Sequence, residues 1–249
     1  MSDLPQRVEL PKRFYTAVEV VPAAGGFTVH LDGRGVKTPA RRPLVVPAEP
    51  VAAAMAAEWE AQRERIDPAT MPMTRLVNTV IDGIAETAEE TRADLARYVE
   101  TDLLFYRVGE PARFVARQQA IWDPILKGAE VSLGRRFVLG EGVMHVAQPA
   151  ESISAFRERI ERVNDPFAIA ALHQITTLTG SALIALALLE GRLDAEAAWA
   201  AAHLDEDWNI ELWGADAEAS ARRAARFVDM ETAAELLAAV TEAPTPQAM

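Results

Sequence analysis

The sequence predicts an α+β protein in which a small N-terminal antiparallel β-rich domain is followed by a larger, mainly α-helical domain. Over residues 14–46, apolar and polar residues alternate in short runs separated by turn residues, which is the pattern of half-buried strands. From residue 51 onward, apolar residues recur at helical spacing between Pro, Gly and capping residues. We expect residues 1–84 to form the first domain with one or two helices, 85–240 the helical domain, and 241–249 a flexible tail.

The β-rich part is expected to contain four short strands, at residues 14–21, 27–31, 36–38 and 44–46. Gly25 and Gly26 provide the first turn. Asp32 and Gly33 provide the second, because an Asp-Gly pair readily adopts the positive φ of a tight hairpin. Pro39 and Pro43 separate the last two runs and keep these strands short. A small antiparallel sheet follows from this arrangement.

The first helices are predicted from the prolines and capping residues at their ends. Pro47 and Pro50 precede a helix at residues 51–65, and Pro72 begins another that runs to residue 84. Thr87 with Glu90 three places later matches a capping box, so a third helix is expected to begin there and to continue to about residue 105.

The rest of the chain is predicted to be helical, with one short hairpin at residues 136–139 and 143–146. Pro124 is expected to kink or end the helix in which it lies, and Ser152 or Ser154 is expected to cap the helix that follows the hairpin. The predicted helices cover residues 113–127, 156–163, 167–179, 182–191, 194–213, 216–228 and 231–240.

Composition excludes several classes of function. Half of the residues are hydrophobic and a quarter are charged, as in folded globular proteins. The net charge of −12 disfavours binding to nucleic acid and to anionic membranes. The lack of cysteine excludes disulfides, thiolate catalysis and Cys-ligated metal. No apolar run approaches ~20 residues and no signal or transit peptide is visible, so no stable membrane insertion and a cytoplasmic location are expected.

A search for catalytic patterns finds no convincing site. The chain has no phosphate-binding Gly-x-x-x-x-Gly-Lys loop. His203 and Asp207 lie one helical turn apart, a spacing that suits two metal ligands but more often marks a solvated polar face. Glu100 and Asp102 are two residues apart and do not face each other on a helix, so a cap or a surface salt bridge is the preferred interpretation.

Two of the five tryptophans lie within a run of acidic residues near the end of the chain. Trp208 and Trp213 are surrounded by Asp205, Glu206, Asp207, Glu211, Asp216 and Glu218. Large aromatic residues mixed with charges are common in binding surfaces. Tryptophan is also mostly buried in folded proteins, so core packing and partner binding both remain open for this pair.

Several segments, in this order and spacing, resemble one protein family, the assembly chaperones of the α subunit of the F-type ATP synthase. They include Phe27-Thr28-Val29-His30-Leu31-Asp32-Gly33-Arg34, Glu58-Trp59, Met71-Pro72-Met73-Thr74-Arg75-Leu76, Tyr98-Val99-Glu100-Thr101-Asp102, Leu204-Asp205-Glu206-Asp207-Trp208 and Trp213-Gly214. The resemblance extends from about Lys12 to Val240. It implies a two-domain fold, no enzymatic activity and no cofactor.

The resemblance also implies a partner, the free α subunit, which such chaperones hold before it pairs with β. By the same resemblance, the client-binding residues are Glu206 first, then Asp205, Asp207 and Glu211 with Trp208 and Trp213, while Trp59 packs a helix on the sheet. Many relatives carry Glu where this chain has Asp205 and Asp207. Scarce lysine and the absence of a presequence indicate a bacterial member in the cytoplasm, whereas eukaryotic relatives act in the mitochondrial matrix.

Two alternatives remain beside the chaperone hypothesis. The first is an enzyme with a carboxylate site around His203, Asp207 and Glu211, which that cluster of polar residues motivates. The second is a stable structural subunit of the synthase, which the acidic composition permits. The chaperone is preferred because of the family resemblance and because the residues alone show no catalytic constellation.

Overall fold

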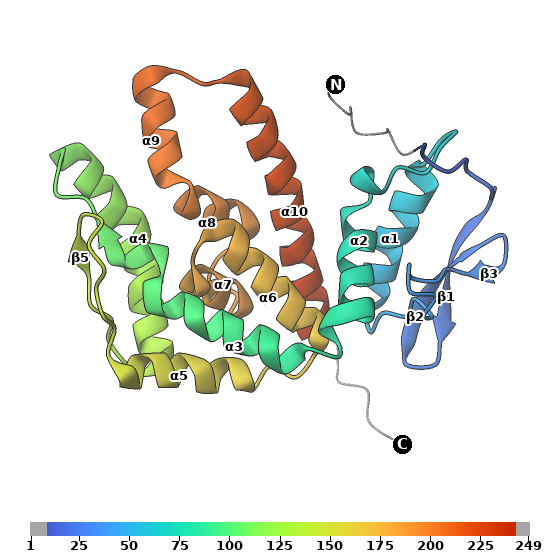
Figure 1. Ribbon diagram of the computed structural model, residues 1–249, viewed down its shortest axis with the longest axis horizontal. Helices are drawn as coiled ribbons and strands as arrows, with labels where there is room; N and C mark the ends of the chain where they lie inside the picture. Colours follow the sequence, from blue (N-terminus) through green and yellow to red (C-terminus); the bar gives the residue numbers. More distant parts are fainter. Residues whose placement is uncertain (1–8, 243–249) are drawn as a thin grey trace, which may run out of the picture. The chain divides into compact units, whose positions relative to one another are not determined.

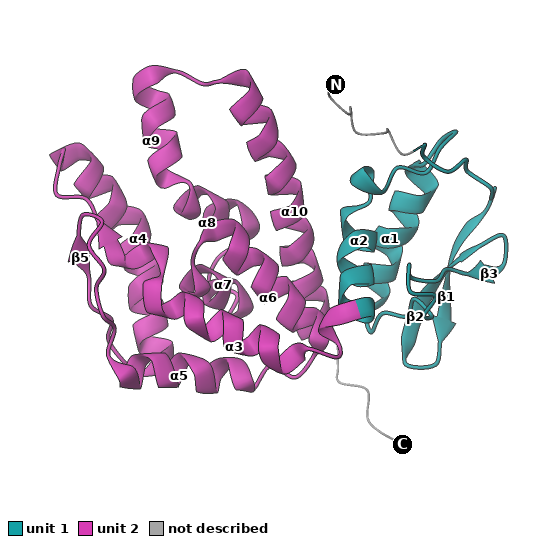
Figure 2. Cartoon of the chain, viewed as in Figure 1, with its two compact units in different colours: residues 1–82, 245–249 teal, residues 83–244 magenta. Residues whose placement is uncertain are grey.

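The computed structural model describes residues 9–242 (Figure 1). The chain divides into two compact units, the first ending at Asp82 and the second beginning at Gly83 (Figure 2). The first unit contains a three-stranded antiparallel sheet and the second is mostly helical, which confirms the predicted fold class.

The sheet of the first unit has the strand order β1-β2-β3, with β1 at Val18–Ala23, β2 at Gly26–Leu31 and β3 at Arg34–Gly35. The predicted Asp-Gly hairpin is confirmed, because Asp32 and Gly33 have φ angles of 49° and 76°.

Two of the predicted strands are much reduced. The run at 36–38 forms no regular strand, since β3 ends at Gly35 and Lys37 pairs with Pro43 only as an isolated bridge. The run at 44–46 contributes one pairing, in which the amide and carbonyl of Val46 bond those of Phe27 at 2.9 and 2.8 Å. Prolines 39 and 43 cannot donate ladder hydrogen bonds, which accounts for the loss.

In the first unit one helix, α1, covers the sheet and a second helix, α2, packs on α1. Helix α1, Glu49–Ala61, buries Val51, Ala52 and Met55 against β1 and β2. It ends four residues before the predicted position, because the backbone at Gln62 is extended. A short 3₁₀ turn, Pro68–Thr70, leads to helix α2, Pro72–Thr79, which continues as a single π turn at Val80–Ile84.

The second unit is built around a helix that is apolar on every side. Helix α7, Ala182–Leu189, has six consecutive buried residues, as expected of a helix enclosed by others. It contacts α4, α6 and α8. The remaining helices of this unit are α3 Ala88–Tyr98, α4 Ala112–Leu133, α5 Ala150–Glu161, α6 Pro166–Thr179, α8 Ala195–Ala202, α9 Leu204–Trp213 and α10 Ala217–Glu242, with 3₁₀ turns at Val99–Thr101 and Leu103–Phe105.

Two predicted helix caps are wrong. Thr87 precedes α3 as expected, but its hydroxyl donates to the carbonyl of Gly83 at 3.4 Å and makes no capping bond. Ser152 lies inside α5, where it is buried and its hydroxyl donates to the carbonyl of Arg136 at 2.6 Å. In both cases the hydroxyl donates its hydrogen bond to a backbone carbonyl and does not cap the start of a helix. Helix α5 begins at Ala150, before both of the serines predicted to cap it.

The helix predicted at 113–127 is longer than expected, and of the two alternatives for Pro124 the one in which it ends the helix is wrong. Helix α4 continues past this proline for nine residues and ends at Gly134, whose φ of 63° is a typical C-terminal cap. Trp122, Ile125, Leu126 and Ala129 form one buried face on both sides of the proline. Burial of that face therefore outweighs the hydrogen bond that the proline removes.

Two further predictions, of a hairpin and of two separate C-terminal helices, are wrong. The hairpin at 136–146 does not form, since β5 (Gly140–Glu141) pairs in parallel with β4 (Tyr106–Arg107). The two predicted C-terminal helices are one, α10, which includes Thr241 and Glu242. The rest of the predicted tail, residues 243–249, lies outside the described residues. Across residues 9–242, no helix combines the length and the apolar character required to cross a bilayer.

Candidate functional site

Helix α9 carries all six residues that the sequence nominates for partner binding. The sequence predicts one helix from residue 194 to 213, but the backbone leaves the helical region at His203, with φ −109° and ψ 24°. The His203 ring is buried, with Nδ1 2.9 Å from the carbonyl oxygen of Trp199 and its centroid 3.7 Å from the Trp199 ring. The break makes α9 a separate helix that forms a hairpin with α10 (Figure 1).

One side of α9 packs on α4 through Trp208. Its ring is buried and stacks on Phe114 of α4, with ring centroids 4.8 Å apart and an interplanar angle of 17°. The guanidinium carbon of Arg113 lies 5.4 Å from the centroid of the same ring. For Trp208, this geometry supports packing rather than direct contact with a partner.

Two acidic residues flank Trp208 on the α4 side. Glu211 forms ion pairs with Arg117 and, at 3.5 Å, with Arg113. Partial burial raises the pKa of Asp205, and a hydrogen bond from the Gln118 side chain acts in the opposite direction. Residues 205, 208 and 211 are spaced three apart and therefore share one helix face. This face holds α9 on α4.

The opposite side of α9 borders a cavity of about 540 Å³ between α9 and α10. We call this cavity and its lining the α9–α10 groove. Glu206, Ile210 and Trp213, one turn apart on α9, line it together with Arg222, Arg223 and Arg226 of α10.

The charges of the groove are largely paired, whereas its aromatic residue is free. Asp207 lies 2.5 Å from Arg223, and Glu206 lies 3.9 Å from the same guanidinium group. Trp213 is 84 % exposed, and Ile210 and Leu212 are exposed beside it. An exposed tryptophan rimmed by charges is the composition of a protein-binding surface.

The arrangement does not bring the proposed enzyme residues together. His203 bonds to the Trp199 carbonyl, Asp207 pairs with Arg223, and Glu211 pairs with Arg117. Burial lowers the pKa of His203, which favours the neutral imidazole. Among residues 9–242 there is also no group of three His, Asp or Glu placed to hold a metal ion.

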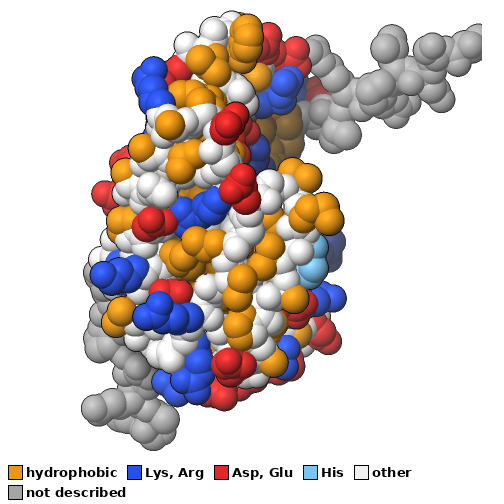
Figure 3. Space-filling view, turned by 90° about the vertical axis from the view of Figure 1, so that its left-hand side faces the viewer, with side chains coloured by type: hydrophobic (Ala, Val, Ile, Leu, Met, Phe, Trp, Pro, Cys, Tyr) orange, Lys and Arg blue, Asp and Glu red, His pale blue; other side chains and the backbone are white. Residues whose placement is uncertain are grey.

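Sequence reasoning missed the basic half of the groove and a set of exposed apolar residues at the end of α4 and in the segment after it. The arginines of α10 are separated from α9 in sequence and meet it only in the hairpin. The exposed apolar residues are Val131, Val138, Leu139, Val143 and Met144. Figure 3 views the side that carries α4 and α9, where apolar side chains lie in patches between charges of both signs. Apolar residues bounded by glycines 134, 140 and 142 were the available signal.

Comparison with known proteins identifies relatives along most of the chain. Residues 12–130 match the model of the family described as ATP12 chaperone protein. The crystal structure of the Atu1473 protein of Agrobacterium tumefaciens is 51 % identical, with 93 % of this chain and 87 % of that chain covered and a TM-score of 0.88.

Two further relatives carry the ATP12 name. The crystal structure of Atp12 from Paracoccus denitrificans is 37 % identical, with 92 % of this chain and 97 % of that one covered and a TM-score of 0.85. Mitochondrial protein atp12 of Schizosaccharomyces pombe is 25 % identical over 215 residues, which is 82 % of this chain and 74 % of that protein. Because it is 37 % identical to that Atp12 over nearly all of both chains and matches the family model, the chain belongs to the ATP12 chaperone family.

Proposed function

We propose that this chain binds the free α subunit of the F-type ATP synthase, shields its subunit-pairing surface from aggregation and hands it over to β during assembly of the catalytic head. The chain catalyses no reaction and hydrolyses no nucleotide in this role. It acts in the bacterial cytoplasm. Membership of the ATP12 chaperone family supports the proposal.

One observation carries the assignment of the binding surface. The α9–α10 groove exposes Trp213 and Ile210 on a helix that is otherwise anchored by ion pairs and by Trp208, and Leu212 is exposed next to Trp213. A helix held on both sides presents its free residues at little cost in conformational entropy. We assign Trp213 as the apolar anchor for the client and Glu206 as the charged contact beside it.

The other four residues have supporting roles in this proposal. Asp207 and Glu211 hold α9 between Arg223 of α10 and Arg117 of α4. Trp208 and Asp205 fix the helix on α4. Client binding therefore depends on them through the position of α9.

Release follows from competition for the same surface. Obligate interfaces in a subunit ring bury ~2,000 Å² or more and are apolar, so an unassembled α subunit exposes a surface prone to aggregation. When β covers that surface with higher affinity, it displaces the chaperone by mass action.

The decisive experiment co-expresses the α subunit with this chain or its variants and measures soluble complex and affinity. Glu206→Lys and Trp213→Ala are expected to weaken binding by about 10- to 30-fold, as for interface residues worth ~1.4–2 kcal/mol. Glu158→Lys, an exposed charge reversal on α5, is the matched control and should bind as the parent does. Equal solubility of α with and without the chaperone would refute the function.

If α is kept soluble but both groove variants bind normally, the function stands and the assigned surface is wrong. The exposed apolar residues Val143 and Met144 are then the next to test. Purified intact synthase should lack this chain, since a structural subunit would remain in it.

A further inference from the structure

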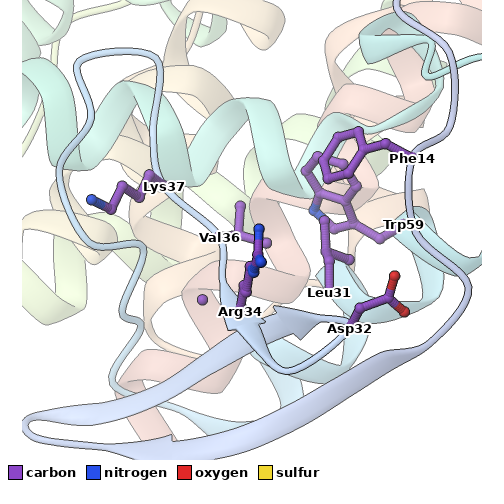
Figure 4. A pocket seen from close by; sticks show the side chains of 8 residues that line it. Phe14, Leu31, Asp32, Arg34, Val36, Lys37 and Trp59 are labelled. Carbon is purple, nitrogen blue, oxygen red and sulfur yellow. The ribbon is translucent and has the colours of Figure 1, made fainter.

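The first unit contains a pocket that the proposed function does not use. It has a volume of about 510 Å³ and lies between the sheet and α1 (Figure 4). Phe14, Leu31, Val36 and Trp59 supply its apolar lining. Phe14 is 73 % exposed, so this aromatic ring lies at the mouth of the pocket and not in the core. The volume is within the range of sites that bind small ligands or a few side chains.

The tryptophan of this pocket has an unsatisfied donor. The indole Nε1 of Trp59 is buried, and no acceptor for it exists among residues 9–242. The Trp59 ring is positioned by an edge-on contact with Tyr15, at 5.7 Å between centroids, and the Tyr15 hydroxyl donates to the Trp59 carbonyl at 2.7 Å. Buried N–H groups are nearly always hydrogen-bonded. An orphaned donor in a pocket wall indicates an acceptor supplied by a ligand.

The charged residues of the pocket are unequally available. Arg34 and Lys37 are exposed and form no ion pair with any described residue. The carboxylate of Asp32 is already engaged, since it accepts from the backbone N–H groups of Ala17 at 2.8 Å and Thr16 at 3.1 Å. These hydrogen bonds lower its pKa. Figure 4 shows Lys37 at one end of the lining, Arg34 in the middle, and Phe14 and Trp59 near the other end.

The distribution of charge along the chain also favours an acidic ligand for this pocket. Residues 83–242 hold 15 Lys and Arg against 27 Asp and Glu, whereas residues 9–82 hold nine of each. The whole net charge of −12 therefore belongs to the second unit. An acidic ligand is repelled by that unit and not by the first, where two unpaired cations attract it.

We propose that this pocket binds an extended peptide segment of a partner protein in which an apolar side chain is flanked by Asp or Glu. The apolar side chain occupies the space beside Phe14, Leu31 and Trp59. A backbone carbonyl accepts from Trp59 Nε1, and the flanking carboxylates pair with Arg34 and Lys37. The site is distinct from the α9–α10 groove, so the two are tested separately.

The test titrates the full chain, labelled with ¹⁵N, with the peptide acetyl-Glu-Glu-Phe-Glu-Glu-amide and follows the five tryptophan indole N–H resonances. The Trp59 resonance, identified by its loss in Trp59→Phe, is expected to move downfield to saturation as it gains an acceptor. The same peptide with Gln in place of Glu should bind about tenfold more weakly, and the Lys version should not bind.

Two variants distinguish binding in the pocket from non-specific electrostatic attraction of the acidic peptide to the protein. Arg34→Glu should weaken binding of the acidic peptide by about tenfold. Arg63→Glu, which makes the same charge change at an exposed position outside the pocket, should leave the affinity unchanged. Urea denaturation of each variant verifies that the fold is retained. An unmoved Trp59 resonance, equal affinity for the Glu and Gln peptides, or equal effects of the two variants would overturn the proposal.

Discussion

The buried carboxylate of Asp102 allows a sharp test of what stabilises the helical unit. Its Oδ1 accepts from the backbone N–H of Leu104 at 3.0 Å and from the Ser181 hydroxyl at 2.7 Å, and its Oδ2 accepts from the N–H of Leu183 at 2.9 Å. The side chain is fully buried. It therefore joins the turn after α3 to the N-terminus of α7. The sequence predicted a cap or a surface salt bridge at Asp102; the cap forms, but the carboxylate is buried and also binds α7.

Burial raises the pKa of Asp102 from 3.8 to about 6, against the lowering effect of its hydrogen bonds. Because the folded-state pKa is the higher one, the contribution to stability is fully present below pH 3.8 and is lost as the pH rises through about 6. At ~1.36 kcal/mol per pH unit, the total loss is about 3 kcal/mol, of which about 2 kcal/mol falls between about pH 4.5 and pH 7.5.

The perturbation is Asp102→Asn, which has the same shape and does not ionise. One of its two oxygen positions becomes an amide that faces an N–H or O–H donor, so the variant loses about 1–3 kcal/mol through an unsatisfied buried donor. The free energy of unfolding is measured by urea denaturation at pH 4.5 and pH 7.5 for both proteins. Comparing the two proteins at each pH cancels the titration of all other groups.

The expected result is a stability gap between parent and variant that narrows by about 2 kcal/mol as the pH rises from about 4.5 to 7.5. Asp194→Asn at the exposed cap of α8 controls for the loss of one negative charge, since Asn caps a helix as well as Asp does. A gap that widens with pH would refute the reasoning, because the three donors would then outweigh burial and the folded pKa would lie below 3.8.

Two further predictions concern helix starts. Glu58 of α1 accepts from the N–H groups of Met73 and Thr74 at 2.6 and 2.8 Å and so caps α2 from another helix; Glu58→Gln should lower the free energy of unfolding by about 1–3 kcal/mol in urea denaturation. Asp165→Ala should lower the free energy of unfolding by about 1 kcal/mol, because the Asp165 side chain caps α6 by accepting from two backbone N–H groups. Thr87→Ala should change it by less than about 0.5 kcal/mol, because Thr87 makes no capping bond. Equal losses of stability in the two variants would contradict this explanation.

Elements whose signals lie within a few residues were predicted well. The Asp32-Gly33 turn formed as expected, because the preference for positive φ belongs to those residues themselves. Helix α6 begins after Asp165 and ends at Gly180, again through local capping preferences. A helix was also predicted over the apolar run of α7, where it forms.

Elements whose outcome depends on distant residues were predicted poorly. The hydroxyl of Ser152 resembles a cap in sequence, but the carbonyl of Arg136 takes its hydrogen bond. Helix α4 passes through Pro124 because the buried face around Trp122 continues beyond it. The strand at 140–141 has its partner at 106–107, which no pattern within either segment indicates.

The sequence by itself determined the fold class, the family resemblance and the acidic helix on which the proposed binding residues lie, because periodicity, turn chemistry and ordered motifs depend on neighbouring residues. Only the tertiary structure decided which of those residues are available. Trp208 and Trp213 are five residues apart in the same acidic run, yet α4 buries the first through Phe114 and leaves the second exposed beside α10. Burial is set by the neighbours that packing brings together, and these neighbours are about 90 residues away along the chain in the case of Phe114.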